Sequence, residues 1–170
     1  MESHTDKGSE LLLDDALRPI LISTWIGPAT LDLVDEFYRW CDGQVAKAKR
    51  RGYPVILISD ATLAGRPNAD VRKAFAAAKF DVDVPFKSIV IINNKIIRGA
   101  MTAIGWLLGD MSGTINCRSL AEALPIAVAA AEAHDRVVPV PSSEVLADYV
   151  ARSEARVASQ AISHQTGSAG

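Results

Sequence analysis

Tyr53-Pro-Val-Ile-Leu-Ile58 and Ser88-Ile-Val-Ile-Ile92 are two short runs of branched apolar residues, and they decide the fold of this 170-residue chain. A run that is apolar at every position is typical of a strand covered by helices on both faces of a sheet. Thr30 can cap a helix that runs to about Arg51, because apolar residues recur there at a spacing of three and four. The sequence therefore predicts an α/β domain built around two buried strands.

The other predicted elements extend this core in both directions. They are a hairpin over 10–26, a loop over 60–67, a helix that Asn68 or Asp70 opens, a helix over 97–108, a strand over 114–117 and a helix from Ser119 to His134. The order β-β-α-β-α-β-α-β-α, with an extra C-terminal helix, indicates a mixed sheet with helices packed on it. We expect a disordered tail over 1–9, the α/β domain over 10–138, an appended amphipathic helix over 139–159 and a second disordered tail over 160–170.

Composition restricts the partners and the compartment. Twenty acidic and 18 basic residues give a net charge of −2, and the one tight basic cluster, Lys47–Arg51, closes a predicted helix, where cations complement the helix dipole. The N-terminus is polar, and the uncharged stretch over 99–109 is far shorter than the roughly 20 residues of a membrane span. Cys41 and Cys117 read as buried free thiols of a reducing compartment. We expect a cytoplasmic chain with no nucleic-acid partner and no membrane span.

Known catalytic motifs are missing from the sequence. It contains no GxSxG, GxGxxG, Walker or HExxH pattern. Of the three histidines, His4 and His164 lie in the predicted tails and His134 lies at a helix end, away from the strand ends where α/β enzymes gather catalytic groups. Asp81 and Asp83 form a DxD pair that we interpret as a solvated turn. We therefore expect no catalytic residue, no metal and no cofactor.

Polar side chains follow both buried strands. Asp60, Thr62, Arg66 and Asn68 come after the first strand, and Asn93, Asn94 and Arg98 come after the second. If the two strands are neighbours, these side chains converge beside two helix N-termini, where free N–H groups and arginines could take an anionic group. The alternative is that Asn and Asp cap helices and turns while the arginines are ordinary surface residues. These seven residues are the candidate binding surface.

The order of segments resembles the SpoIIAA-like group of STAS domains, also labelled STAS/SEC14 domains, over about 10–134. The similarity rests on the hairpin, on Val55-Ile-Leu-Ile-Ser-Asp60, on Ile89-Val-Ile-Ile-Asn-Asn94 before Ile97-Arg-Gly99, and on the last strand followed by Ser119-Leu-Ala-Glu-Ala123. The resemblance implies a STAS-like sheet and a non-enzymatic bacterial signalling module. In better-known members, the serine of an Asp-Ser pair at the start of the helix after the first buried strand is phosphorylated. The stretch 60–68 has no such pair, and Thr62 carries its only hydroxyl.

Three functions follow from these observations. The first choice is a bacterial cytosolic regulatory module that binds a protein partner through the 60–70 loop, the next helix and the 93–98 turn. The alternative is a carrier or sensor of a small apolar or lipidic ligand, with Trp25, Trp40, Trp106 and the 97–108 helix lining a pocket. The third, least supported, is an enzyme that uses Asp60 or Lys95.

Overall fold

A computed structural model defines residues 1–77, 84–92, 114–134 and 139–167 of the protein, with side chains up to Ser159. The chain divides into two units, Met1–Val140 and Pro141–Gly170. The first unit contains the sheet with helices α1, α2 and α4. The second contains helix α5, which spans Ser143–Gly167.

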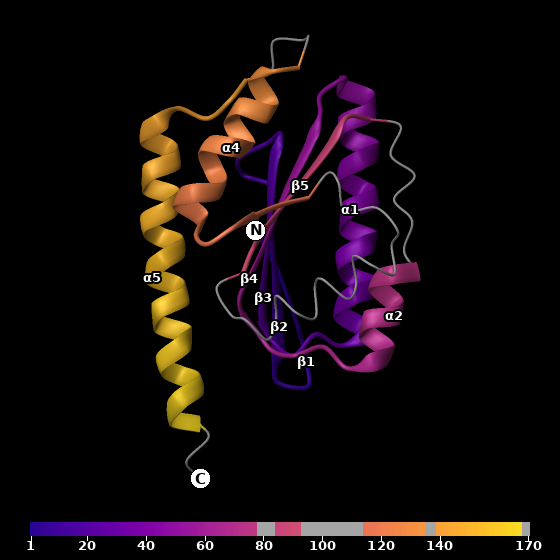
Figure 1. Cartoon of the computed structure of the whole chain (residues 1–170), viewed down its shortest axis with the longest axis vertical. Helices are drawn as coiled ribbons and strands as arrows, with labels where there is room; N and C mark the ends of the chain where they lie inside the picture. Colours follow the sequence, from indigo (N-terminus) through magenta and orange to yellow (C-terminus); the bar gives the residue numbers. More distant parts are fainter. Residues whose placement is uncertain (78–83, 93–113, 135–138, 168–170) are drawn as a thin grey trace. The chain divides into compact units, whose positions relative to one another are not determined.

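A sheet forms the centre of the first unit (Figure 1). As the structure describes it, the sheet has six strands in sequence order from β1 to β6. The strands are β1 (Glu2–Asp6), β2 (Ser9–Asp14), β3 (Ile20–Gly27), β4 (Val55–Ala64), β5 (Phe86–Ile91) and β6 (Thr114–Cys117). The pairs β1–β2 and β2–β3 are antiparallel, and the remaining pairs are parallel. This arrangement confirms the predicted α/β class with a mixed sheet, and it makes β4 and β5 parallel neighbours.

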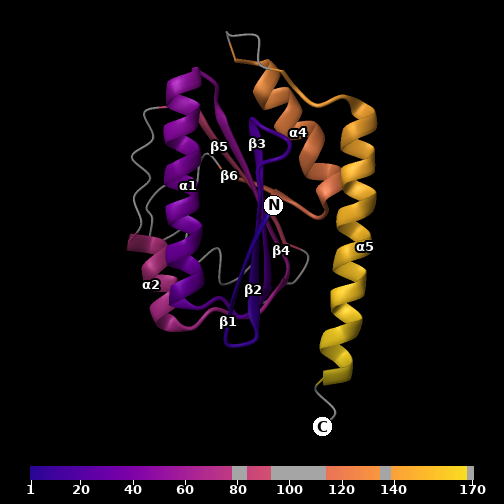
Figure 2. The same cartoon turned by 180° about the vertical axis from the view of Figure 1, so that it is seen from behind.

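Helices cover both faces of the sheet. Helix α1 (Leu31–Arg51) contacts β1, β2 and β4, and helix α2 (Ala69–Ala77) packs against α1. Helix α4 (Leu120–Glu132) lies on the opposite face, over β3 to β6 (Figures 1 and 2). Because side chains alternate along a strand, the apolar runs 55–58 of β4 and 89–91 of β5 supply side chains to both layers, which is why these runs are apolar at every position.

The layer beneath α1 contains a hydrophobic core. Trp25 of β3 packs edge-on against Phe37 of α1 and Phe75 of α2, with ring centroids 5.4 and 5.6 Å apart. These contacts fix both helices on one strand. The fully or nearly buried members of this core include Leu11, Leu13, Leu21, Leu33, Val34, Trp40, Val55, Leu57 and Val71.

Two helix starts lie where the sequence predicts them. The Thr30 hydroxyl accepts a hydrogen bond from the Leu33 amide at 3.4 Å, and α1 ends before Gly52. The Ser119 hydroxyl accepts from the Glu122 amide at 3.2 Å, and the Glu122 carboxylate accepts from the Arg118 amide at 2.8 Å, so both side chains cap the start of α4. Pro125 lies inside α4 without delaying its start.

The β2–β3 turn is tied to α1 through Asp15. Its carboxylate accepts hydrogen bonds from the guanidinium of Arg18 and, at 3.1 Å, from the side-chain amide of Gln44, while the Lys47 ammonium lies 3.8 Å away. Burial on its own would raise the pKa of Asp15, but the hydrogen bonds from Arg18 and Gln44 and the charges of Arg18 and Lys47 outweigh it and lower that pKa. The turn of the predicted hairpin therefore also anchors the helix.

Residues 1–9 were predicted as a disordered tail, and that prediction is wrong. Residues Glu2–Asp6 form β1, which pairs along its whole length with β2. Lys7 and Gly8 make the two-residue connection with φ values of 49° and 79°, as a type I′ turn requires. An edge strand with solvent on one side needs no apolar alternation, so its polar composition resembles that of a tail.

The C-terminal prediction also needs correction. Helix α5 begins at Ser143 as expected, but it continues to Gly167, through most of the stretch assigned to a tail. The predicted helix over 97–108, with Trp106, lies outside the described residues, as do Asp81, Asp83 and Lys95.

Candidate functional site

Three turns lie at one edge of the sheet: Gly27-Pro28 at the end of β3, residues 65–67 after β4, and Lys7-Gly8 between β1 and β2. We call it the carboxyl edge because the parallel strands β3 and β4 end there. The ladder between these strands closes with Gly27 opposite Ala64. The Gly65 amide then donates to the Gly27 carbonyl at 2.8 Å. Strand β5 runs in the same direction, with Ile91 opposite Asp60, so it ends at this edge too. The turn Lys7-Gly8 between the antiparallel strands β1 and β2 lies on the same side.

Close packing holds these turns together. Ser9, which is buried and follows the Lys7-Gly8 turn, donates a hydrogen bond from its hydroxyl to the Pro28 carbonyl at 2.7 Å. A Cβ placed on Gly65 would lie 2.7 Å from the Pro28 nitrogen and 2.9 Å from its Cα. Only glycine allows two backbones to approach so closely. Contacts from Ser9 through Pro28 to Gly65 therefore give the carboxyl edge a defined backbone.

Asp60 lies inside β4, which corrects the predicted loop over 60–67. Strand β4 continues to Ala64, and Asp60 is buried, with 6% of its surface exposed. The register with β3 shifts after Thr24, where Trp25 alone faces Ala61 and Thr62. Such a bulge leaves one amide without a ladder partner. The Asp60 Oδ1 atom accepts a hydrogen bond from the Thr62 amide at 2.9 Å, so this carboxylate completes the bulge.

Asn68 acts as the helix cap that the sequence offered as an alternative reading. Its Oδ1 atom accepts from the Val71 amide at 2.9 Å, and its carbonyl accepts from the Arg72 amide at 3.1 Å. The Arg72 guanidinium donates to the Pro67 carbonyl at 2.8 Å, which fixes the turn before α2. Asp60, Thr62 and Asn68 therefore have local structural roles at the carboxyl edge.

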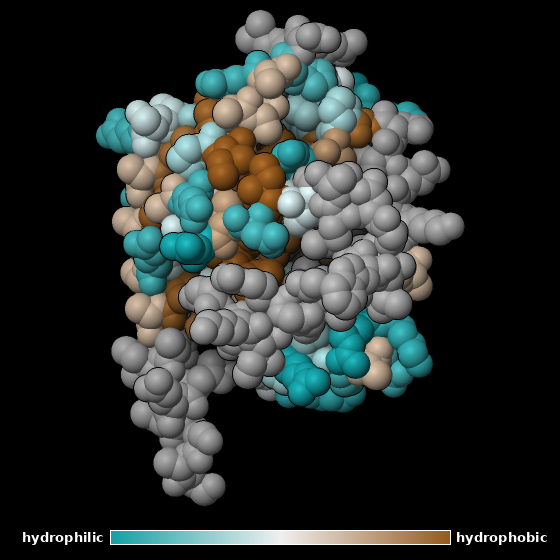
Figure 3. Space-filling view, in the orientation of Figure 1, coloured by the Kyte–Doolittle hydropathy of each residue, from teal (hydrophilic) through white to brown (hydrophobic). Residues whose placement is uncertain are grey.

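Arg66 differs from these neighbours because its side chain is exposed. Within the described part of the chain it has no hydrogen bond or ion pair. On α2, Lys73 lies 3.9 Å from Asp70 in an exposed pair. Figure 3 shows hydrophilic side chains gathered around α2. The turn between β4 and α2 therefore presents a guanidinium to solvent from a well-packed backbone.

Lys7 is a second exposed cation at the carboxyl edge, and sequence reasoning missed it because residues 1–9 were assigned to a tail. The signal that could have found it is the Lys7-Gly8 pair, because a residue followed by glycine allows a two-residue turn before the apolar residues Leu11 to Leu13. Of the seven predicted surface residues, Asn93, Asn94 and Arg98 lie outside the described residues.

Thiols and possible metal ligands elsewhere in the described residues complete the chemistry of the chain. Cys41 and Cys117 are free and buried, as expected, and burial with the neighbouring Asp42 raises the pKa of the Cys41 thiol. In the described ranges, no group of three or more His, Cys, Asp or Glu side chains is arranged to hold a metal ion. None of the helices within those ranges combines the length and apolar composition needed to cross a membrane.

Comparison with known proteins leaves the family open. No protein-family model matches the chain, and neither curated proteins nor solved structures include a match.

Proposed function

We propose that this chain is a non-enzymatic bacterial regulatory module with a STAS-like fold, and that it binds a protein partner at the carboxyl edge. The observation that carries the proposal is Arg66, an exposed guanidinium on a turn whose backbone is fixed on both sides. Gly65 is packed on Pro28 before it, and Asn68 caps α2 after it.

A fixed turn favours binding because less conformational freedom is lost when a partner docks. The planar guanidinium can donate two parallel hydrogen bonds to one carboxylate, which gives both affinity and orientation. Lys7 adds a second exposed cation at the same edge. The partner surface that fits this chemistry is an acidic patch on a folded protein.

The roles of Asp60 and Asn68 support a binding module over the enzyme hypothesis. Both side chains satisfy backbone amides, of Thr62 and Val71 respectively. A catalytic carboxylate or amide must instead contact the substrate. The STAS-like assignment is supported by the hairpin and by the three parallel pairs that follow it.

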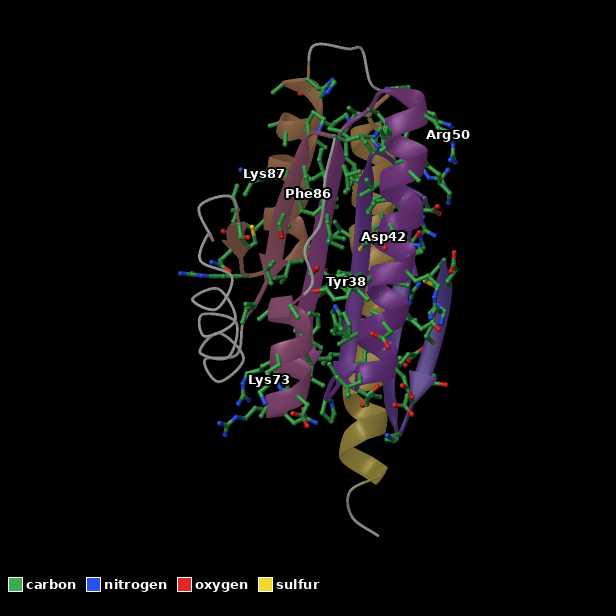
Figure 4. All side chains as sticks on the ribbon, turned by 90° about the vertical axis from the view of Figure 1, so that its right-hand side faces the viewer. Tyr38, Asp42, Arg50, Lys73, Phe86 and Lys87 are labelled. Carbon is green, nitrogen blue, oxygen red and sulfur yellow. The ribbon has the colours of Figure 1, made fainter. Side chains whose placement is uncertain are left out.

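A capture experiment with three versions of the full-length chain tests the proposal. Wild type, Arg66→Glu and Arg50→Glu are each used to capture proteins from cells of the source organism, with quantification by mass spectrometry. Arg50 is the matched control because it is an exposed arginine at the C-terminal end of α1. Figure 4 shows Arg50 at the opposite end of the view from Lys73 of α2, the helix that follows Arg66.

We expect a specific partner whose recovery falls at least about tenfold with Arg66→Glu and is unchanged with Arg50→Glu, the loss of one charged interface pair being worth that much. Equal loss with both variants would show a general charge effect, and no loss with either would reject the carboxyl edge as the contact. Native mass spectrometry of the same wild-type protein tests the carrier alternative, which predicts a bound small molecule.

A further inference from the structure

Strand β1 leaves one side of the sheet open. It is the first strand in the sheet order, and no strand among the described residues pairs with its outer side. Its inner side pairs with β2 in a register that ends with Asp6 opposite Ser9. The His4 Nδ1 atom lies 3.8 Å from the Glu36 Oε2 atom of α1, so the strand also contacts the helix layer.

The hairpin geometry decides which backbone groups face outward. The two residues that flank a two-residue loop form a hydrogen-bonded pair, and such pairs alternate along an antiparallel ladder. Glu2, His4 and Asp6 therefore bond to β2, whereas Ser3 and Thr5 direct their N–H and C=O groups away from it. Both Ser3 and Thr5 are exposed. The outer edge thus offers two donors and two acceptors with the spacing of a strand.

The charge of the hairpin indicates what this edge attracts. Glu2, Asp6, Glu10 and Asp14 oppose Lys7 alone, so the β1–β2 hairpin has a formal charge of −3 within a chain whose total is −2. The excess of negative charge is therefore concentrated in the strand pair at the edge of the sheet. Glu36, beside His4 on the α1 side, is paired with Arg39 and adds no net charge to this edge.

A second copy of this chain does not fit the edge. Antiparallel pairing of two β1 strands through Ser3 and Thr5 would place Glu2 of one copy opposite Asp6 of the other. Like charges directly opposite each other destabilise a strand pair, and charged edge strands commonly prevent such self-association.

We propose that the outer edge of β1 binds an extended basic segment of another protein as an added strand. Backbone groups of the segment would pair with those of Ser3 and Thr5. Basic side chains at alternate positions would lie opposite Glu2 and Asp6. Strand addition takes its affinity from the backbone hydrogen bonds and its specificity from alternate side chains, so the pattern recognised by Glu2 and Asp6 is basic-x-x-x-basic.

Fluorescence anisotropy with the full-length protein and two labelled peptides tests this inference. The probe is Lys-Val-Lys-Thr-Lys-Val-Lys, and the matched peptide replaces Val and Thr by Pro, which keeps the charge but removes the N–H groups that would pair with β1. We expect the proline peptide to bind at least about tenfold more weakly, since it loses the two hydrogen bonds that its N–H groups would donate to the Ser3 and Thr5 carbonyls. Equal binding of the two peptides would overturn the proposal in favour of non-specific charge attraction.

Variants of β1 provide the second arm. Thr5→Pro removes one outward N–H, and proline is tolerated on an edge strand where that N–H faces solvent. We expect about fivefold weaker binding of the probe, and unchanged binding for Thr5→Val, which keeps the N–H. Wild-type affinity in a folded Thr5→Pro protein would overturn the proposal. So would a free-chain dimer in sedimentation that Thr5→Pro dissociates, because the occupant would then be a second copy.

If Thr5→Pro does not fold, the peptide pair on the wild-type protein decides the question. Arg66→Glu should leave peptide affinity unchanged, because that residue lies on the β4–α2 turn and the proposed contact lies along β1. The proposal of strand addition at β1 and the proposed partner contact at Arg66 can therefore fail independently.

Discussion

The role of Asp60 can be tested by comparing Asp60→Ala with Asp60→Asn. Asp60 is buried, and its Oδ1 atom lies 2.9 Å from the amide nitrogen of Thr62 at the β4 bulge. Removing the acceptor leaves the part-buried Thr62 N–H without its partner, which costs about 1–3 kcal/mol. We therefore expect Asp60→Ala to lower the free energy of unfolding by about 2 kcal/mol. Asn keeps an oxygen at the same place, so Asp60→Asn should lose less than about 1 kcal/mol.

The assay is urea unfolding followed by circular dichroism. With a urea dependence of about 2 kcal/mol per molar, a loss of about 2 kcal/mol lowers the midpoint by about 1 M. Asp42→Ala is the matched control, since Asp42 is exposed on α1, and its effect should stay within about 0.5 kcal/mol. A neutral Asp60→Ala would show that the bulge does not depend on this side chain. Equal losses for Asn and Ala would show that the charge, not the acceptor, is required.

Three further predictions concern stability. The pKa of Asp15 is lowered from its ordinary value of 3.8, so its carboxylate stabilises the fold above that value and stabilises it less as pH falls through the folded pKa. The difference in free energy of unfolding between wild type and Asp15→Asn, measured by urea titration, should therefore shrink below about pH 4. Gly65→Ala should cost about 1–3 kcal/mol through its clash with Pro28, whereas Gly43→Ala, in α1 with open space around its Cβ, should gain about 0.5–1 kcal/mol. Truncation after Val140 should leave a cooperative thermal transition, since the residues beyond it form a separate unit.

The buried centre of the fold could be predicted from sequence because its signals are local and strong. The apolar runs of β4 and β5 have too few polar residues for any exposed strand, and α1 repeats its apolar residues over 21 positions. Burial and helical periodicity both follow from the spacing of side chains, so neighbours in the sequence are enough to specify them.

The bulge and the edge strand could not be predicted in this way. The predicted strand ended at Ile58 and the predicted loop began at Asp60, since a carboxylate is unfavourable in a buried strand. In the folded chain the Thr62 amide donates a hydrogen bond to this carboxylate and offsets that cost. The polar residues Glu2 to Asp6 of β1 are compatible with an edge strand and equally with a solvated tail. The pairing with β2 is what distinguishes the two.

Among the predicted surface residues, Asn68 separates structural support from direct contact with a partner. Its side chain caps α2 through the Val71 amide, so Asn68→Ala should cost about 1 kcal/mol and loosen the turn that holds Arg66. Serine caps helices about as well as asparagine, so Asn68→Ser should restore both stability and the capture of the partner. If stability returns with Ser but capture does not, the Asn68 amide itself contacts the partner, and the carboxyl edge binds through more than its cations.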